Sequence, residues 1–255
     1  MSSRDIRRKY GQNYLKDPAI LFEMGEGISP QEYENFIEVG PGLGALTNQI
    51  NKKNINIIGI DIDAKNIEFL KKRFQKPADF IFKEQDILQY EIEDLNKNYR
   101  IVGNLPYNIS TQIILKLINS YENIKDMHFL VQKEVALKIV GKVSSKNWGK
   151  LAIKIAAFFN CEILFDVPPD AFDIKPKVVS SFIRIIPKKD INYDLSIKEK
   201  FYKIIDLAFS SRRKNIKNNL KSLNIDWKKL DINPTKRPEE ISLNEFIKIT
   251  QDQHS

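Results

Sequence analysis

The stretch Gly103-Asn104-Leu105-Pro106-Tyr107 lies where the sequence predicts that a buried strand gives way to a helix. Residues 99–102 before it are typical of the end of a strand, and the apolar spacing of residues 113–118 after it predicts a helix. Residues 108–111 offer an N-cap for that helix. Because ligands bind at the carboxyl ends of strands in open α/β sheets, we expect this stretch to form part of a ligand site.

The residue types in this stretch suit a flat heterocycle that carries an amino group. Asn104 offers a carboxamide oxygen as an acceptor, and Leu105 is extended because it precedes a proline, which frees its carbonyl. Pro106 fixes the backbone, and Tyr107 supplies a face for stacking. Two acceptors and a ring could hold the N6 amino group of an adenine. The alternative is a strand that ends in a proline turn, with Tyr107 packed in the core.

Composition narrows the class of protein. The chain has 255 residues, 42% of them hydrophobic, which suffices for one large domain or for a medium and a small one. Its net charge of +8 and isoelectric point of about 9.3 favour a nucleic-acid partner. The single cysteine, Cys161, excludes an internal disulfide and a multi-cysteine metal site, and only two histidines are present. We expect no metal.

The start of the chain predicts a cytoplasmic protein. The charged residues 1–10 lack the apolar core of a signal peptide, and no apolar run reaches the ~18 residues of a membrane span. Residues 4–9 form a basic arm. Amides and aromatic residues alternate in residues 10–15, which indicates a segment that folds over a ligand, and a helix is expected to begin near Asp17-Pro18.

Two further strand ends carry ligand-binding signals. Residues 36–47 predict a strand, a glycine-rich turn and a helix, with the spacing G-x-G-x-G. This differs from the G-x-G-x-x-G of dinucleotide dehydrogenases, and an ordinary strand-to-helix turn is the alternative. The second strand, residues 56–63, ends in carboxylates, and Asp61 is placed to accept hydrogen bonds from ribose hydroxyls. Asp86 follows a third strand, where it could accept from an adenine amino group; an ordinary surface acid is the alternative.

The remaining pattern predicts an α/β fold with a mostly parallel, Rossmann-like sheet. After the fourth strand we expect a fifth strand, a helix that opens at residues 132–136, a strand buried on both faces and a final strand; the three strands cover residues 127–131, 151–159 and 180–186. Cys161 then follows a strand as an inert apolar residue. Residues 165–178 form a proline-rich loop that presents Phe172 beside a ligand or packs it in the core.

The pattern becomes purely helical after residue 188. We therefore divide the chain into a first domain, residues 1–188, and a basic all-α domain, residues 189–255. Two capping boxes are expected, Ser196 with Glu199 and Ser242 with Glu245. The segment from residue 212 to residue 229 contains many basic residues and a single acid. This excess of positive charge favours contacts with a nucleic-acid backbone over a solvated surface. The RNA-binding candidates are Arg212, Arg213, Lys214, Lys217 and Lys221.

Taken together, these motifs resemble the ribosomal RNA small-subunit adenine N6,N6-dimethyltransferase family of the bacterial KsgA type. The resemblance covers nearly the whole chain, and the order and spacing of the motifs make it specific. It rests on residues 10–15, 38–44, 85–86, 103–107, 132–136, 172–178, 212–214 and 237–240. It implies methyl transfer from S-adenosylmethionine, without a metal, by a monomer that acts on 16S rRNA within the immature small ribosomal subunit.

The resemblance also implies roles for individual residues. Asn13 and Leu15 would close over the methyl donor. The backbone of Gly40 and Gly42 would approach it. The donor ribose and adenine would be held by Asp61 and Asp86. The catalytic group would comprise Asn104, Leu105, Pro106, Tyr107 and Phe172, with the two rings enclosing an extruded adenine. Three positions depart from the family pattern: Asp61 replaces a glutamate, Ile174 a proline and Trp148 a tyrosine.

Three other functions fit parts of the pattern. A large-subunit rRNA adenine methyltransferase would share the core, but the blocks at residues 212–214 and 237–240 favour the small-subunit substrate. A non-catalytic ribosome-assembly factor would not need the intact set of acid, glycine and Asn-Leu-Pro-Tyr residues. A nicotinamide dehydrogenase would need a different glycine spacing.

Overall fold

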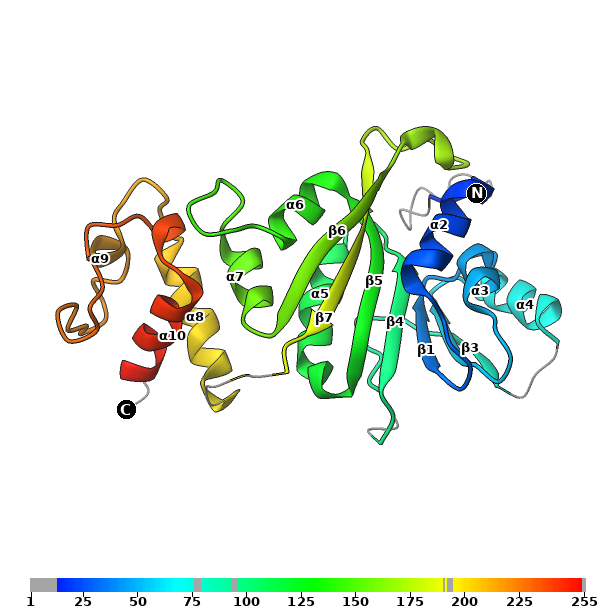
Figure 1. The fold of residues 1–255 in the computed structure, drawn as a ribbon, viewed down its shortest axis with the longest axis horizontal. Coiled ribbons are helices and arrows are strands. Elements are labelled where there is room, and N and C mark those ends of the chain that lie inside the picture. Colours follow the sequence, from blue (N-terminus) through cyan, green and yellow to red (C-terminus); the bar gives the residue numbers. More distant parts are fainter. Residues whose placement is uncertain (1–12, 76–78, 93–95, 190, 192–194, 254–255) are drawn as a thin grey trace. The chain divides into compact units, whose positions relative to one another are not determined.

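The computed structural model describes residues 13–75, 79–92, 96–189, 191 and 195–253. Seven strands form one sheet in the order β3-β2-β1-β4-β5-β7-β6 (Figure 1). Neighbours from β3 to β5 are parallel, and β5 pairs antiparallel with β7, which confirms the expected mostly parallel sheet. The strands are β1 (Asn35–Val39), β2 (Asn56–Asp61), β3 (Phe80–Glu84), β4 (Tyr99–Asn104), β5 (Ile124–Gln132), β6 (Phe159–Val167) and β7 (Ser180–Pro187).

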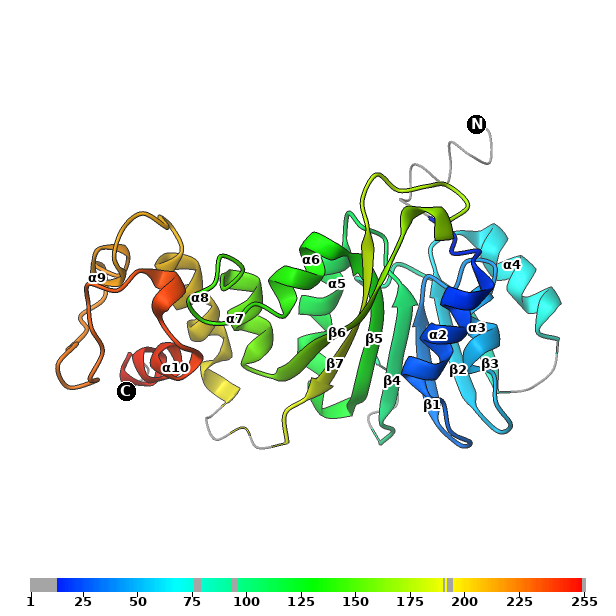
Figure 2. The ribbon, with the colours of Figure 1, turned by 45° about the horizontal axis from the view of Figure 1, so that its top comes forward.

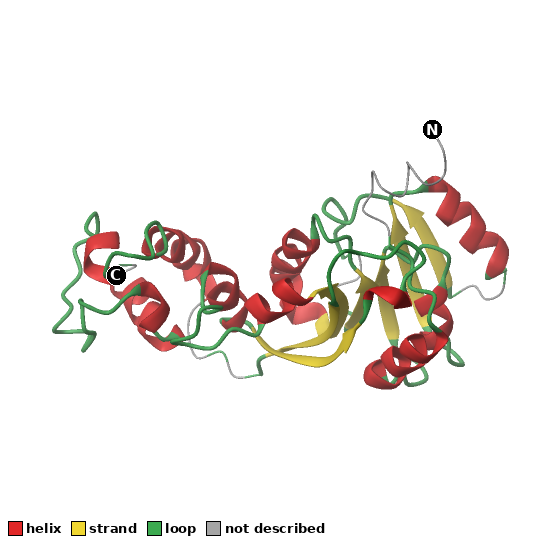
Figure 3. Cartoon of the chain, turned by 90° about the horizontal axis from the view of Figure 1, so that it is seen from above, coloured by secondary structure: helices red, strands yellow, loops and turns green. Residues whose placement is uncertain are grey.

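Helices cover both faces of the sheet. The crossover from β1 to β2 runs one way along the sheet and that from β4 to β5 runs the other way, so right-handed connections place α3 and α5 on opposite faces (Figure 1). Seen from above, helices lie on both sides of the strands (Figure 3). The strand order therefore reverses between β1 and β4. The helical segments that accompany the sheet are α2 (Pro18–Ile28), α3 (Ala45–Ile50), α4 (Ala64–Arg73), α5 (Ser110–Leu117), the 3₁₀ helix Ile118–Asn123, α6 (Lys133–Ile139) and the 3₁₀ helix Pro169–Ala171.

The main core lies between the sheet and the pair α2 and α3, which pack side by side (Figure 2). Met24 of α2, Ile50 of α3 and Phe36 of β1 are fully buried there. Asp17 caps α2 by accepting from the amides of Ala19 and Ile20, as its position before Pro18 predicts. The segment before α2 is held in place by backbone hydrogen bonds, from the amides of Lys16 and Asp17 to the carbonyl of Ala171 and from the amide of Asp173 to the carbonyl of Tyr14.

A buried arginine fixes the opposite edge of the sheet. Arg100, 5% exposed, donates two hydrogen bonds to Asp126, one to Glu34 and two to the carbonyls of Ile28 and Ser29. The two carboxylates raise its pKa against the opposing effect of burial. Ile28 and Ser29 lie at the end of α2, Glu34 immediately precedes β1 and Asp126 belongs to β5, so this one side chain of β4 joins three other parts of the chain.

The chain forms two compact units, residues 1–136 with 161–187, and residues 137–160 with 188–255. The division into domains after residue 188 stays a prediction. The contacts within the structure place residues 137–160 in the same unit as the helical residues 188–255. In that unit the Trp148 indole donates to the carbonyl of Ile241 over 2.8 Å. Its helices are α7 (Lys150–Ala156), the 3₁₀ helix Leu195–Ile197, α8 (Lys198–Ala208), α9 (Ile216–Asn219), the 3₁₀ helix Pro238–Glu240 and α10 (Leu243–Asp252).

One predicted strand is wrong. Residues 151–156 belong to α7, residues 157–158 form a turn, and β6 begins at Phe159, so that Cys161 lies within β6. A short apolar run does not distinguish a buried helix from a buried strand, and the Leu and Ala residues here favour the helix. The strand β6 also extends to Val167, so the loop begins later than predicted.

One of the two capping boxes is correct. Ser242 accepts from the amide of Glu245, whose carboxylate accepts from the amide of Ser242. The other prediction is wrong, because α8 begins at Lys198 after a 3₁₀ turn and its N-cap is Ile197. Likewise α5 has Ile109 as its N-cap, without a side-chain hydrogen bond.

Burial makes His128 a source of acid sensitivity. It is 1% exposed on β5, and neither ring nitrogen has a hydrogen-bond partner within the described residues. Burial lowers its pKa from 6.5 to about 4, although Asp126 raises it in part. Between pH 6.5 and 4 the imidazole of His128 is protonated in the unfolded chain but stays neutral in the folded chain. The free energy of unfolding should therefore fall by roughly 3 kcal/mol over this range. Urea unfolding at several pH values measures this loss.

The control is His128→Phe, which removes the titrating ring but keeps an aromatic side chain. Acids that lie away from the ring are unaffected by the change, so the difference between the two proteins reports His128 together with its neighbour Asp126. Equal losses of stability in wild type and variant between pH 6.5 and 4 would contradict the assignment.

Candidate active site

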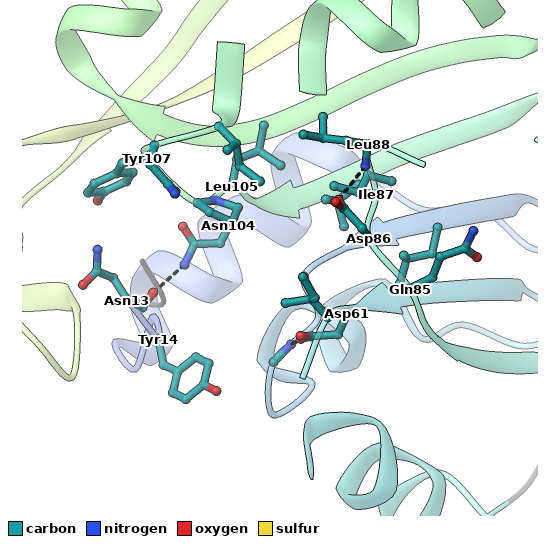
Figure 4. Close-up of a pocket in the computed structure, with 18 residues that line it drawn as sticks. Asn13, Tyr14, Asp61, Gln85, Asp86, Ile87, Leu88, Asn104, Leu105 and Tyr107 are labelled. Carbon is teal, nitrogen blue, oxygen red and sulfur yellow. Dashed lines mark hydrogen bonds between the residues drawn. The ribbon is translucent and has the colours of Figure 1, made fainter. Parts of the chain in front are cut away.

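A cavity of about 270 Å³ opens at the carboxyl edge of the sheet, where the strand order reverses (Figure 4). Parallel strands end on the same edge, so β1, β2, β3 and β4 all contribute their last residues or the loops after them. The N-terminal segment adds two residues. The lining residues used below are Asn13, Tyr14, Gly40, Gly42, Asp61, Gln85, Asp86, Asn104, Leu105, Pro106 and Tyr107.

The glycine turn gives the cavity an open backbone wall. Gly40 has φ of +64°, and a Cβ there would meet no atom within 4 Å, so its backbone faces open space. Gly42 also has positive φ, +56°, but a Cβ there would lie 2.8 Å from the ring of Tyr14. The absence of side chains thus lets a ligand approach at Gly40 and lets Tyr14 pack at Gly42.

The carboxylate of Asp61 is held by three hydrogen bonds. It accepts from the amides of Gly42 and Asp63 and from the carboxamide of Asn66, over 3.1, 2.9 and 3.0 Å. Burial raises its pKa against the lowering effect of these bonds. A carboxylate has about four acceptor positions, so capacity for one further hydroxyl is left.

Asp86, in the loop after β3, and Asn104, at the end of β4, both project into the cavity (Figure 4). Asp86 accepts from the amide of Leu88 over 2.8 Å, which fixes its carboxylate. The nitrogen of the Asn104 carboxamide donates to the carbonyl of Asn13 over 2.7 Å. This bond uses one of the two N–H groups of the carboxamide and fixes the plane of the group, which determines which way its oxygen points. Asn104 is therefore oriented as an acceptor in the cavity.

Tyr107 forms the wall beside Asn104. Its hydroxyl lies 2.6 Å from the hydroxyl of Ser180, which is fully buried at the start of β7. Burial raises the pKa of Tyr107, so this ring is neutral at physiological pH. The cavity thus combines acceptors with an uncharged aromatic face.

A second cavity, of about 440 Å³, adjoins the first on the other side of Tyr14. The two share Tyr14, Gly40 and Asn104. Glu38, which is 1% exposed, lines the second cavity and accepts a hydrogen bond from the Thr47 hydroxyl over 2.6 Å. Burial raises its pKa to about 7. A ligand longer than the first cavity could extend past Gly40 into the second.

Comparison with known proteins agrees with this geometry. The model of the family described as ribosomal RNA adenine dimethylase matches residues 3–251. The chain belongs to this family. Proteins named ribosomal RNA small subunit methyltransferase A are 36% identical over 251 residues in Dechloromonas aromatica and 37% identical over 258 residues in Neisseria meningitidis serogroup C. These matches cover 98% of this chain and 98% and 97% of the relatives.

Solved structures share the fold. A dimethyladenosine transferase from Plasmodium falciparum aligns with a TM-score of 0.81 at 24% identity, covering 93% of this chain and 96% of its own. The 23S rRNA methyltransferase ErmE aligns with a TM-score of 0.76 at 18% identity, covering 95% and 100%. The Rossmann-like fold of this family, followed by a helical region, is therefore present here.

The structure brings most of the predicted site residues together. Asn13, Gly40, Gly42, Asp61, Asp86 and residues 104–107 all line the first cavity. Leu15 lines only the second cavity, where it is 7% exposed and forms a β-bridge with Phe172. The earlier part of the opening motif, residues 10–12, and the basic arm at residues 4–9 lie outside the described residues.

Phe172 corrects one prediction. Its side chain is fully buried in the core between α2, α3 and the sheet, and it does not line the cavity. The bridge to Leu15 and the 3₁₀ helix Pro169–Ala171 turn it inward. In this conformation Phe172 packs in the core, as the alternative interpretation of the loop predicts. Of the two rings expected to enclose an adenine, only Tyr107 lines the cavity.

Sequence reasoning missed three residues that shape the site. Tyr14 packs on Gly42, and its hydroxyl donates to Asn66, which in turn donates to Asp61. The place of Tyr14 between Asn13 and Leu15 was an available signal for it. Ser180 carries no sequence signal, because its partner Tyr107 lies 73 residues away. Asn66 lies only five residues after Asp61, but nothing in the sequence marks it as the link between Asp61 and Tyr14, which is 52 residues away.

The predicted RNA-binding residues occupy one short part of the helical unit. All five are exposed, on the loop before α9, on α9 and just after it. The buried side chain of Asn219 holds this loop by donating to the carbonyls of Ser211 and Lys214. Arg212 also lines a cavity of about 290 Å³ with Lys146 and Lys150. The arrangement suits a polyanion.

Within the part of the chain that the structure describes, every helix falls short of the length and apolar character that a membrane crossing requires.

The glycine turn yields a test of the packing at Tyr14. Gly42→Ala and Gly40→Ala place alanine in the same left-handed backbone region, which costs ~1–2 kcal/mol each. Only the first also drives a methyl group into the Tyr14 ring. Gly42→Ala should therefore lower the free energy of unfolding more than Gly40→Ala, as measured by urea denaturation. Equal losses in the two variants would contradict the packing argument.

Proposed function

We propose that this protein transfers methyl groups from S-adenosylmethionine to N6 of adenines in small-subunit 16S rRNA, and that two adjacent adenines are dimethylated on the immature subunit by a monomer in the cytoplasm. The observation that carries the proposal is the orientation of Asn104. Its carboxamide nitrogen is bound to Asn13, which leaves the oxygen as an acceptor beside the neutral Tyr107 ring. An exocyclic amine on a flat base matches those two groups.

The donor would lie along the reversal point of the sheet. Its adenine would meet Asp86, and a ribose hydroxyl would take the remaining acceptor position of Asp61. Its methionine part would pass Gly40 toward the second cavity. The space beside Gly40 is open, because a Cβ at this position would meet no atom within 4 Å. This path brings the sulfonium close to Asn104, which lines both cavities.

The reaction is an in-line displacement of the sulfonium methyl group by the N6 nitrogen. The lone pair of N6 is delocalised into the adenine ring, so acceptors that favour a pyramidal nitrogen lower the barrier. The Asn104 oxygen and the Leu105 carbonyl would supply them. Holding two reactants in line can contribute ~7–11 kcal/mol. The product ammonium is acidic and releases its proton to water without a strong base.

The two rivals share the fold but predict different behaviour. A large-subunit rRNA methyltransferase would act on the other ribosomal subunit. An assembly factor would bind the small subunit without transferring a methyl group. The names of the relatives support the small-subunit reaction. Mass spectrometry of rRNA from both subunits, after incubation with labelled donor, distinguishes the three.

Loss of Asp86 should weaken donor binding. Asp86→Ala removes the proposed partner of the donor adenine, and we expect a loss of ~1–3 kcal/mol in the binding free energy. Isothermal calorimetry with S-adenosylmethionine measures it. Thermal unfolding serves as the control, since the side chain also accepts from Leu88. Unchanged affinity in a folded variant would rule out this assignment.

Loss of Asn104 should slow the chemical step. An acceptor that binds best while N6 becomes tetrahedral stabilises the transition state more than the ground state. Asn104→Ala should therefore cut the single-turnover rate by ~10²-fold. Binding to small subunits should change little, because phosphate contacts dominate it. Asn104→Asp keeps an oxygen acceptor but loses the donor to Asn13, so it separates the acceptor from its orientation. A near-normal rate in Asn104→Ala would show that this residue does not carry the chemistry.

Loss of the basic cluster should change the salt dependence of RNA binding. Replacing Arg212, Arg213 and Lys214 with alanine should reduce the log–log salt slope by up to ~0.7–0.9 for each lost phosphate contact. Filter binding at several salt concentrations measures it. A variant with alanine at Lys52, Lys53 and Lys65 removes the same charge from exposed positions of the other unit. The same slope in both variants would mean that the cluster is only a solvated surface.

A further inference from the structure

Ser180 is buried at the edge of the sheet that carries the cavity. The strand β7 is antiparallel to β5, and Ser180 pairs with Gln132, the last residue of β5. An antiparallel strand brings its first residue to the edge where its parallel neighbours end. Ser180 therefore reaches the carboxyl edge from the opposite chain direction to β1, β2, β3 and β4.

The hydroxyl of Ser180 has a partner on the wall of the cavity. It lies 2.6 Å from the hydroxyl of Tyr107, a residue of the loop after β4. Ser180 itself is 0% exposed, whereas Tyr107 lines the cavity beside Asn104. The backbone at Tyr107 lies in a turn that the Ile109 amide closes by donating to the Pro106 carbonyl over 3.2 Å, so the main freedom left to the side chain is the swing and tilt of its ring. A hydrogen bond at the far end of the ring removes that freedom.

We propose that Ser180 is a positioning residue for the target adenine, which it serves by fixing the plane of the Tyr107 ring. The inference rests on the proposed function, because it assumes that Tyr107 stacks on the base to be methylated. A ring that is held before the base arrives loses less conformational freedom when the base stacks on it. Ser180 would thus favour capture of the extruded base without touching the base, the donor or the reacting atoms.

The neighbouring Ser181 provides a matched control. It follows Ser180 on β7 and is equally buried, but its hydroxyl donates to Asp166 instead, over 2.6 Å. Successive side chains of a strand point to opposite faces, which explains the different partners. Ser180→Ala and Ser181→Ala remove the same atom from the same strand, yet only the first changes the restraint on Tyr107.

The test compares Ser180→Ala, Tyr107→Phe, their double variant and Ser181→Ala. Methyl transfer to purified small subunits gives kcat/KM, calorimetry gives donor affinity, and thermal unfolding reports folding. Ser180→Ala and Tyr107→Phe should each lower kcat/KM for subunits by about 10-fold, the effect of one lost hydrogen bond. The double variant should lose no more than either single variant, because both remove the same bond. Donor affinity should stay at the wild-type value throughout, and Ser181→Ala should keep wild-type kcat/KM.

Several results would overturn the inference. Ser180→Ala with wild-type kcat/KM, or with a loss that Ser181→Ala matches, would assign Ser180 to the fold alone. Independent, multiplying losses in the double variant would mean that the two hydroxyls do not act through each other. If Ser180→Ala does not fold, Tyr107→Phe breaks the same bond from the cavity side, and its unchanged kcat/KM would equally overturn the inference. Wild-type protein that methylates no small subunits would overturn the proposed function and this inference with it.

Discussion

The close approach of β4 to the end of β1 is the constraint on which the site depends. A Cβ at Gly103 would lie 2.5 Å from the carbonyl oxygen of Val39, so only glycine fits there. This approach places Asn104, the next residue, beside the turn that begins at Gly40. The acceptor that the chemistry needs and the open backbone that admits the donor are therefore adjacent for a steric reason. The reversal of strand order at the same place leaves the space above them uncovered by a crossover helix.

The sequence predicted the parallel strands and their ends because each carries a local signal. The G-x-G-x-G turn, Asp61, Asp86 and the stretch from Gly103 to Tyr107 all reach the edge that a parallel sheet dictates. Prediction from the sequence failed where one local pattern is compatible with two different structures. The apolar residues of α7 fit a strand equally well, and the aromatic Phe172 fits both a ligand site and a core. In both cases contacts distant along the chain made the choice.

The residues that hold the site in place could not be predicted from the sequence either, because their roles also depend on contacts with distant parts of the chain. Ser180 and the partners of Arg100 act through hydrogen bonds that span tens of residues, and Asn66, which binds the nearby Asp61, is itself bound by Tyr14 from 52 residues away. Each is an ordinary polar residue in its own neighbourhood. The cavity residues contact ligand and so have characteristic types and spacings, whereas their supports need only a donor or an acceptor in the right place. A sequence therefore predicts the groups that do chemistry better than the groups that orient them.

Asp61, at a position where the resemblance implies a glutamate, illustrates how such supports matter. A shorter acid would reach less far toward a ribose, and the sequence offered no means of judging whether the chain compensates. In the structure the carboxylate is bound by the amide of Gly42 and by Asn66, and Asn66 is itself bound by the hydroxyl of Tyr14. The N-terminal segment, α4, β2 and the glycine turn thus meet at one carboxylate. Because Tyr14 also packs on Gly42 and separates the two cavities, the segment that would close over the donor is tied to the acid that would hold its ribose. The aspartate is thus long enough to hold the glycine turn and Asn66 directly, and a longer side chain at this position would have to rearrange those two hydrogen bonds.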